Sequence, residues 1–425
     1  MRRRGVGWLG ASIASGLLAS APCGACSTDV AVDGSSSSGG IDGSSVVEGG
    51  GSASSSVAET STDAAAPDLD AGSIQLIGRF DTRDPAGPKC AWPGCRILAR
   101  FEGPSVSVDL NEIDETWMEG APSEWDVSID DLPTEKLVTT PGKKTYALAS
   151  NLAAGAHEVE LYKRTETQNG VTQLLGFDFG GGRLLAPPPR HARKIEIIGD
   201  SAPAGFGVEG VGHPDNDCPG LDYSARWQNF RRSFGALLGT TLEAEVHATV
   251  YSGKGMVKNI WRFDTDTMPL LFPLANPVDF TSTYDFAWKP DVVILMIGGN
   301  DFAEGQPDEA DGKGPATPTE FTDAYRTFAQ TLRTSYPDAH LFLTVSPSVK
   351  DEDAPAGRNP RTNISATVTT VTNERNAAND TKVYAFSPTV SPPSELTACN
   401  GHGSPAFHVR VAAELEAIVK EKTGW

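Results

Sequence analysis

Two hydrophobic patterns divide this chain. Between residues 73 and 185, apolar and polar residues alternate in short runs, for example at 96–101, 106–110 and 157–162. Turn residues separate the runs, and none of them has the period of an amphipathic helix. Many short alternating runs of this kind predict a β-sandwich, for which we expect the jelly-roll form.

The pattern changes after Pro187-Pro188-Pro189, which we interpret as a stiff hinge. Almost wholly apolar runs, typical of buried parallel strands, now alternate with segments of helical period. The expected strands are 194–198, 243–250, 291–297, 340–345 and 382–386. The expected helices are 229–238, ended by Gly239, and 319–335, 363–376 and 409–421. This alternation predicts an α/β domain with a three-layer parallel sheet.

The first 71 residues show neither pattern. Three arginines follow Met1, and a short apolar segment then precedes Cys23 and Cys26, which predicts an export signal at 1–26. The Ala25-Cys26 junction resembles a bacterial lipoprotein signal, in which the cysteine is lipidated. Residues 27–71 are rich in Ser, Gly and Ala and predict a flexible tether. We therefore expect a β-sandwich at 72–188, an α/β domain at 189–425, and a secreted or surface-anchored bacterial lipoprotein.

Composition narrows the possible partners. The formal net charge of -20 argues against binding nucleic acid, and leaves an N-terminal lipid as the expected membrane attachment. The acidic residues are scattered, so the charge identifies no substrate. No group of His, Cys and Asp has metal-ligand spacing, and we expect neither a metal nor a cofactor. The six cysteines of an exported chain can form disulfides.

Candidate catalytic groups follow the predicted parallel strands. Ser201 ends a Gly-Asp-Ser turn after the first strand, Gly253 follows the second, and Asn300 follows the third. His402 precedes the last helix. Because open α/β sheets bind ligands at the carboxyl ends of their strands, these groups are expected to meet. Ser201 would be the nucleophile and His402 the base, with the N–H groups of Ser201 and Gly253 and the Asn300 amide as the oxyanion hole.

The order of these blocks resembles the SGNH (GDSL-like) hydrolase superfamily. The block Ala91-Trp92-Pro93-Gly94 in the β domain and Trp288-Lys289-Pro290 before the third strand are most similar to carbohydrate esterase family 2. The resemblance implies a serine esterase that removes O-acetyl groups from xylan- or glucomannan-type polysaccharides through an acetyl-serine intermediate. It implies a carbohydrate partner, and we expect a monomer.

Two other functions stay open. The family's usual acid two residues before the histidine is replaced by Asn400. We therefore expect a Ser–His pair, whose ring is oriented by a backbone carbonyl or by a carboxylate from elsewhere. The missing acid also leaves open a non-catalytic carbohydrate-binding protein on an esterase scaffold. An SGNH lipase or thioesterase, which would need an apolar acyl groove, is the third possibility.

Several further residues have expected roles. We expect Asp200, Asp301 and Asn400 to support the loops of the site. Lys254 either contacts substrate or is simply solvated, and His408 is expected to be a surface or capping residue. Disulfides are expected between Cys90 and Cys95 and between Cys218 and Cys399, because the loops of the second pair should meet at the same edge of the sheet.

Overall fold

The computed structural model describes residues 73–113, 122–213, 218, 225–303 and 314–425. The predicted export signal, the lipidation site at Cys26 and the tether lie outside these residues and stay predictions. Among the described residues, no helix combines the length and the apolar character that a membrane span requires.

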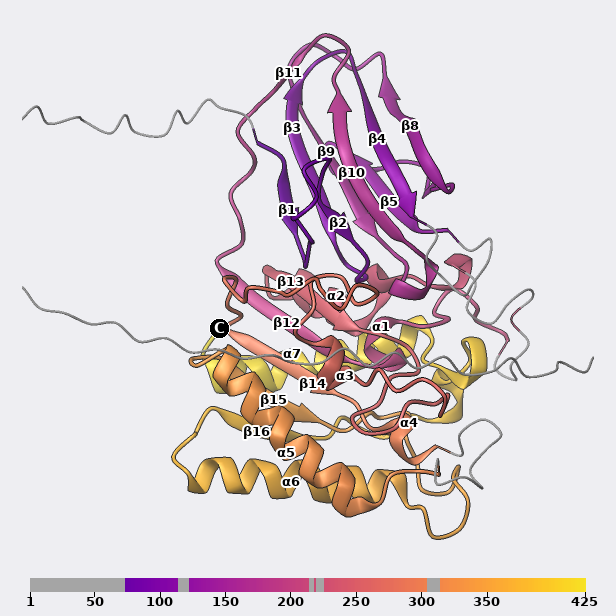
Figure 1. The fold of residues 1–425 in the computed structure, drawn as a ribbon, viewed down its shortest axis with the longest axis vertical. Coiled ribbons are helices and arrows are strands. Elements are labelled where there is room, and N and C mark those ends of the chain that lie inside the picture. The colour runs from indigo at the N-terminus through magenta and orange to yellow at the C-terminus, as the bar shows by residue number, and fades with distance from the viewer. Residues whose placement is uncertain (1–72, 114–121, 214–217, 219–224, 304–313) are drawn as a thin grey trace, which may run out of the picture. The chain divides into compact units, whose positions relative to one another are not determined.

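The N-terminal part of the described chain is a sandwich of two antiparallel sheets (Figure 1). One sheet has the order β1-β3-β9-β5-β6, with β11 beside β3 and β7 beside β5. The other has the order β2-β10-β4-β8. The strands are β1 Gln75–Ile77, β2 Lys89–Cys90, β3 Arg96–Glu102, β4 Ser105–Ile113, β5 Glu124–Ile129, β6 Leu132–Pro133, β7 Leu137–Val138, β8 Gly142–Ser150, β9 Ala156–Lys163, β10 Val171–Asp178 and β11 Arg183–Leu184.

Alternation along these strands produces the core of the sandwich. In β4, Val106, Val108 and Leu110 are buried while the residues between them are not. Trp92 and Trp125 are fully buried in the same core. The predicted β-sandwich is confirmed, and Trp92 is buried where the sandwich meets the α/β domain, with its Nε1 donating to the Leu274 carbonyl at 3.4 Å.

The second part is a five-stranded parallel sheet of order β13-β12-β14-β15-β16. Its strands are β12 Arg193–Gly199, β13 Ala244–Val250, β14 Val292–Met296, β15 His340–Thr344 and β16 Val383–Phe386. β12, the first strand of this sheet along the chain, therefore pairs with both β13 and β14. β14 is buried along its whole length and is a continuous apolar run, as the sequence predicts. In β12 the buried isoleucines are interrupted by the buried Glu196.

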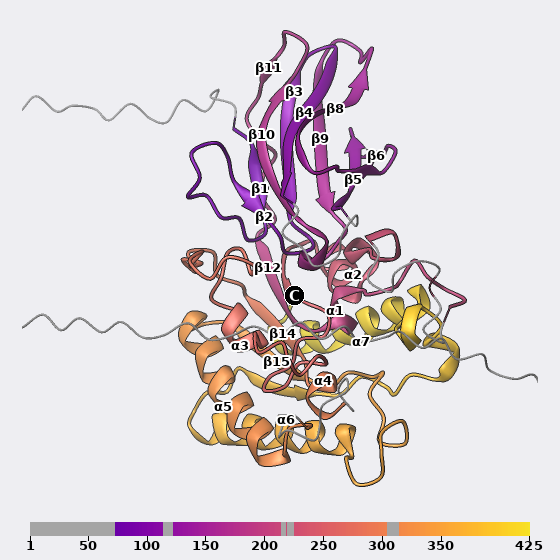
Figure 2. The same ribbon diagram turned by 45° about the vertical axis from the view of Figure 1, so that its right-hand side comes forward.

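Helices cover both faces of this sheet and complete the predicted three layers. Figures 1 and 2 both show α5 and α6 side by side. Val293 and Leu295 of β14 belong to the hydrophobic core formed with these two helices, whereas Ile294 and Met296 belong to the core formed with α2 and α7. The helices are α1 Ser201–Ala204, α2 Phe234–Thr241, α3 Met268–Leu271, α4 Gly299–Phe302, α5 Pro318–Ser335, α6 Pro360–Ala377 and α7 Pro405–Thr423.

Three details of the helices differ from the sequence prediction. The helix predicted at 229–238 begins at Phe234 instead, as α2. Ser233 caps α2 by accepting a hydrogen bond from the Ala236 N–H. Gly239 does not end α2, which continues to Thr241. His408 is buried within α7 rather than exposed, and its Nδ1 accepts a hydrogen bond from the Phe234 N–H at 3.2 Å.

The sandwich and the α/β domain are held together by buried polar contacts within one compact unit. Arg79, just after β1, donates from Nη2 to Glu196 Oε1 on β12 at 2.6 Å, and both side chains are fully buried. The guanidinium also lies 4.3 Å from the centre of the Tyr284 ring. Beside it, the Gly78 N–H donates to His247 Nε2 on β13 at 3.0 Å.

Candidate active site

Strand order brings the predicted site residues together. Ser201 follows β12, Gly253 follows β13, and Asn300 lies in α4 directly after β14. Because β12 lies between β13 and β14, its carboxyl end is flanked by the other two. This is the point of an open α/β sheet at which the strand order reverses, where such folds bind their ligands.

Ser201 and His402 form a hydrogen-bonded pair. Ser201 Oγ lies 2.8 Å from His402 Nε2, although the two residues are 201 positions apart in the chain. His402 Nδ1 lies 3.0 Å from the backbone carbonyl oxygen of Cys399. That carbonyl can only accept, so Nδ1 carries the proton and Nε2 is left to accept the proton of the Ser201 hydroxyl.

The surroundings of His402 keep its ring neutral. Burial lowers the pKa of His402, while the hydrogen bond to the Cys399 carbonyl acts in the opposite direction. The ring of Phe206 packs edge-on against the imidazole, with ring centres 4.7 Å apart. A neutral imidazole is the form that a general base requires.

Three candidate N–H donors, those of Ser201, Gly253 and Asn300, follow the carboxyl ends of β12, β13 and β14. Neither the backbone N–H of Ser201 nor that of Gly253 donates a hydrogen bond within the described part of the chain. Asn300 Nδ2 donates one hydrogen to the Lys254 carbonyl at 2.8 Å, and its amide has a second hydrogen to offer. Such preorganised donors are what an oxyanion hole consists of.

The loop that carries Gly253 depends on glycine and on Asp301. Gly253 has φ of 82°, and a Cβ there would lie 2.5 Å from the Trp261 ring. Asp301 accepts hydrogen bonds from the N–H groups of Met256, Val257 and Lys258 at 2.6–2.9 Å. The carboxylate therefore ties the loop after β13 to the loop after β14.

The supporting acids are both buried. Burial raises the pKa of Asp200 to about 7, against the effect of the Ala202 N–H, which donates to its side chain. Burial likewise raises the pKa of Asp301 to about 6. Lys254, which was expected either to contact substrate or to be solvated, is buried, and its Nζ lies 2.6 Å from Asp264 Oδ2.

A disulfide joins the histidine loop to the loop after Ser201. Cys218 and Cys399 are bonded, across 181 positions of the chain. Cys399 is also the residue whose carbonyl accepts the hydrogen bond from His402. Gly207 makes the close approach possible, because a Cβ there would lie 2.5 Å from Cys399 Cβ. The covalent bond thus holds the group that orients the imidazole.

Cys90 and Cys95 form no disulfide, contrary to the sequence prediction. Both are buried free thiols in the core of the sandwich. Cys95 Sγ donates to the Arg79 carbonyl at 3.6 Å. Burial raises the pKa of the Cys90 thiol, which keeps it protonated, and disulfide formation needs the thiolate.

Asn400 does not orient the histidine through its side chain. Its Oδ1 is buried without a hydrogen-bond partner among the described residues, and His402 Nδ1 already bonds to Cys399. We therefore expect Asn400→Ala to keep kcat/KM for ester hydrolysis within about threefold of the parent. A severe loss in a folded Asn400→Ala variant would contradict the Ser–His pair.

Asn400→Asp should shift the pH profile. A carboxylate near the ring favours the imidazolium and raises the pKa of His402. Because only the neutral ring accepts the Ser201 proton, activity falls as pH drops through this pKa. The acid limb of kcat/KM should therefore lie below about pH 6.5 in the parent and move upward in Asn400→Asp. An unchanged limb would show that residue 400 does not act on the ring.

A mostly apolar pocket of about 450 Å³ borders the Gly253 loop. Ser252 and Lys254, on either side of Gly253, line it together with Trp261 and Leu271. Phe263 and Phe280 are exposed at the same pocket, 78% and 54% respectively. Aromatic walls with a few charged groups are typical of sites for amphipathic ligands.

The fold and the Ser–His pair define a class of protein, the two-domain hydrolases of SGNH (GDSL-like) type. Two family models match this chain. The model described as Carbohydrate esterase 2 N-terminal covers residues 76–189, and that of the GDSL-like Lipase/Acylhydrolase family covers residues 197–409.

Individual relatives point to one family within that class. The chain is 33% identical over 364 residues to cellulase/esterase CelE of Acetivibrio thermocellus, covering 85% of this chain and 41% of that protein. It is 28% identical over 276 residues to an acetylxylan esterase/glucomannan deacetylase of Cellvibrio japonicus, covering 64% of this chain and 70% of that protein.

Among solved structures, a family two carbohydrate esterase from Clostridium thermocellum in complex with cellohexaose is similar, with a TM-score of 0.72 and 32% identity. The match covers 83% of this chain and all of that one. This chain therefore belongs to carbohydrate esterase family 2. The predicted resemblance is confirmed, as is the predicted enzyme class, carboxylic ester hydrolase, at the level of the family.

Proposed function

We propose that this chain is a serine esterase that removes O-acetyl groups from polysaccharides of the xylan or glucomannan type. The observation that carries the proposal is the 2.8 Å contact between Ser201 Oγ and His402 Nε2, with Nδ1 held by the Cys399 carbonyl. The name of the Cellvibrio relative supports the substrate class. Two features add support, the donors around Ser201 and the aromatic pocket beside them.

The reaction follows from this arrangement in two halves. Ser201 Oγ attacks the acetyl carbonyl carbon while His402 Nε2 takes the hydroxyl proton. The Ser201 and Gly253 N–H groups and the Asn300 amide stabilise the oxyanion. The sugar oxygen leaves with the proton from His402. A water molecule then gives a proton to His402 and attacks the acetyl-serine, and acetate departs as Ser201 regains its proton.

The aromatic pocket has a place in this proposal. Trp261, Phe263 and Phe280 offer flat apolar faces against which the faces of pyranose rings can pack. The pocket lies beside the loop of Gly253, so a polysaccharide held there would present its acetyl groups near Ser201. In this proposal, Lys254 acts through its backbone carbonyl, which positions Asn300, and its ammonium group pairs with Asp264.

The same pocket favours a second candidate, hydrolysis of esters with longer acyl chains. Acetate release from acetylated xylan and acetylated glucomannan should be measured beside hydrolysis of acetyl, butyryl and octanoyl esters of one alcohol. If the chain is a polysaccharide deacetylase, we expect it to hydrolyse the acetylated polysaccharides faster than the simple esters, and its activity on the simple esters to fall as the acyl chain lengthens. Faster hydrolysis of the octanoyl ester would favour the second candidate instead.

Asn300→Ala should lower kcat by about 10²- to 10³-fold with little change in KM, because one oxyanion donor is lost. Asn300 also donates to the Lys254 carbonyl, so the thermal melt of the variant must be recorded. If the effect appeared in KM alone, Asn300 would be a ground-state contact to substrate.

A further inference from the structure

One loop of the sandwich is buried against the α/β domain. Residues 161–170, at the end of β9 and beyond, are all buried although seven of them, 163–169, are polar. The Arg164 carbonyl accepts a hydrogen bond from the Phe230 N–H at 2.9 Å, and the Glu166 N–H donates to Gln228 Oε1 at 2.8 Å. Polar loops normally lie at the surface, so this burial calls for a physical reason.

The side chain of Glu166 reaches the candidate oxyanion loop. Glu166 Oε2 accepts a hydrogen bond from the Ser252 N–H at 2.6 Å, and Oε1 accepts one from the Ser252 hydroxyl at 2.7 Å. Ser252 directly precedes Gly253. The Glu166 carboxylate of the sandwich thus accepts hydrogen bonds from both donors of Ser252, the residue of the α/β domain that directly precedes Gly253.

This contact is costly to maintain. Glu166 is almost completely buried, and burial raises its pKa to about 7, while the two Ser252 hydrogen bonds act in the opposite direction. The nearby Lys163 is equally buried, and its Nζ donates to the Thr165 carbonyl at 2.9 Å. A well-packed apolar pair would stabilise the interface without the desolvation penalty of a buried carboxylate. Two charge-assisted hydrogen bonds, however, restrict the orientation of a backbone more than apolar packing does.

Gly253 is a residue whose backbone needs such fixing. Glycine has the widest conformational freedom of any residue, and an oxyanion donor must point in one direction. Asp301 holds the loop on the far side of Gly253, through residues 256–258. On the near side, the side chain that holds Ser252 comes from Glu166.

We propose that Glu166 of the β-sandwich is a positioning residue for the oxyanion hole, and that the sandwich is thereby part of the active site. The inference rests on the proposed function, in which the Gly253 N–H stabilises the oxyanion. Glu166 acts through Ser252 and touches no reacting atom.

The test uses the full chain and measures acetate release. Glu166→Ala should lower kcat by about 10- to 100-fold and leave KM within about twofold, because a misdirected donor weakens transition-state binding only. Glu166→Gln should recover most of the loss, because its Oε1 can still accept the Ser252 N–H. Ser252→Ala should add little to Glu166→Ala, since the two residues act as one unit.

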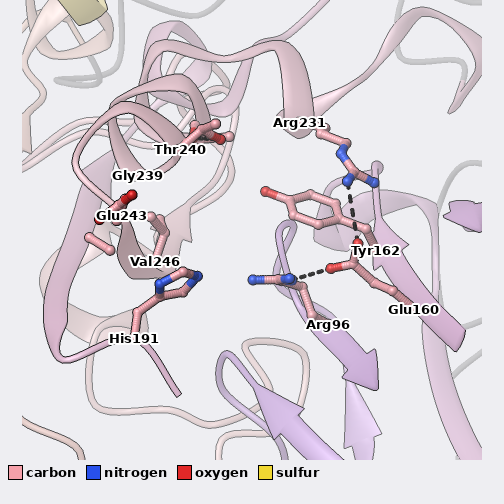
Figure 3. Close-up of a pocket in the computed structure, with 11 residues that line it drawn as sticks. Arg96, Glu160, Tyr162, His191, Arg231, Gly239, Thr240, Glu243 and Val246 are labelled. Atoms are coloured by element: carbon pink, nitrogen blue, oxygen red, sulfur yellow. Dashed lines mark hydrogen bonds and ion pairs between the residues drawn. The ribbon is translucent and has the colours of Figure 1, made fainter. Parts of the chain in front are cut away.

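Glu160→Gln is the matched control. Glu160 lies on β9, shortly before the loop of Glu166, is buried, and joins the α/β domain through Arg231 at 3.3 Å. Figure 3 shows Glu160 between Arg96 and Arg231 in a pocket of about 220 Å³. That pocket is lined by Ala244 and Val246, at the amino-terminal end of β13, opposite the end that carries Gly253. Glu160→Gln should leave kcat unchanged.

Three results would overturn the inference. The first is an unchanged kcat in Glu166→Ala. The second is a loss of kcat in Glu160→Gln as large as the loss in Glu166→Ala. The third is a Glu166→Gln variant that melts like the parent but has a kcat as low as that of Glu166→Ala. The activity of the parent chain distinguishes failure of this inference from failure of the proposed function. Failure of the parent to release acetate refutes the function, whereas an active parent with an unaffected Glu166→Ala refutes the positioning role alone.

Discussion

Ser201→Ala is expected to abolish ester hydrolysis, lowering kcat by about 10⁴- to 10⁶-fold. The hydroxyl that His402 Nε2 contacts at 2.8 Å is the only atom removed, and nothing else at the site can form the acetyl intermediate. The fold should be unaffected, because Asp200 caps α1 through the Ala202 N–H, which the variant keeps. Acetate release and the thermal melt should be measured together.

Covalent labelling tests independently whether Ser201 is the nucleophile. An organophosphonate ester should label the parent chain once, at Ser201, and should not label Ser201→Ala. The assignment of Ser201 would fail if the variant kept more than a small fraction of the parent's activity, or if it were labelled at the same rate.

Arg79→Ala should destabilise the protein by about 3–5 kcal/mol. The substitution leaves the Glu196 carboxylate buried on β12, where Thr249 Oγ1 still donates to it at 2.7 Å. It also removes the guanidinium from the Tyr284 and Phe272 rings, which lie 4.3 and 4.9 Å from it. Chemical denaturation of the full chain would measure the change in the free energy of unfolding.

Arg83→Ala is the control for Arg79→Ala. Arg83 also joins the two domains, through Asp279 at 2.7 Å, but its side chain is 47% exposed. Its loss should cost only about 0–1 kcal/mol, because exposed ion pairs are solvated and screened. Adding Glu196→Gln to Arg79→Ala should recover part of the loss by removing the unpaired charge. Equal costs at Arg79 and Arg83 would mean that burial of the pair is unimportant.

The sequence predicted the features that have a local signature. Apolar runs identified the strands β12 and β14, and the glycine-rich blocks after them located Ser201 and Asn300. β14 is recognisable because burial on both faces of a parallel strand leaves a continuous apolar run, whereas β12 is recognisable from its three isoleucines although Glu196 interrupts them. The roles of Ser201, His402, Gly253 and Asn300 stay predictions that the proposed variants test.

Features that depend on contacts between distant polar residues could not be predicted. Glu166 and Ser252 are 86 positions apart, and nothing near Glu166 distinguishes it from a solvated loop residue. For the group that orients His402, the sequence left a backbone carbonyl and a carboxylate open, and it could not indicate Cys399 because a backbone carbonyl has no residue-type signature. Cys90 and Cys95 were misassigned because their spacing allows a disulfide, whereas their burial as protonated thiols disfavours one.

The buried contacts between the two domains have a consequence for inheritance. A recombination event that replaced the sandwich alone would leave Glu196 without Arg79 and Ser252 without Glu166. Such a hybrid gene would encode an α/β domain with an unpaired charge in its core. We therefore expect exchange of one domain without the other to give a less stable and less active protein, and the match to CelE accordingly takes in both domains, spanning 85% of this chain and 41% of that longer protein.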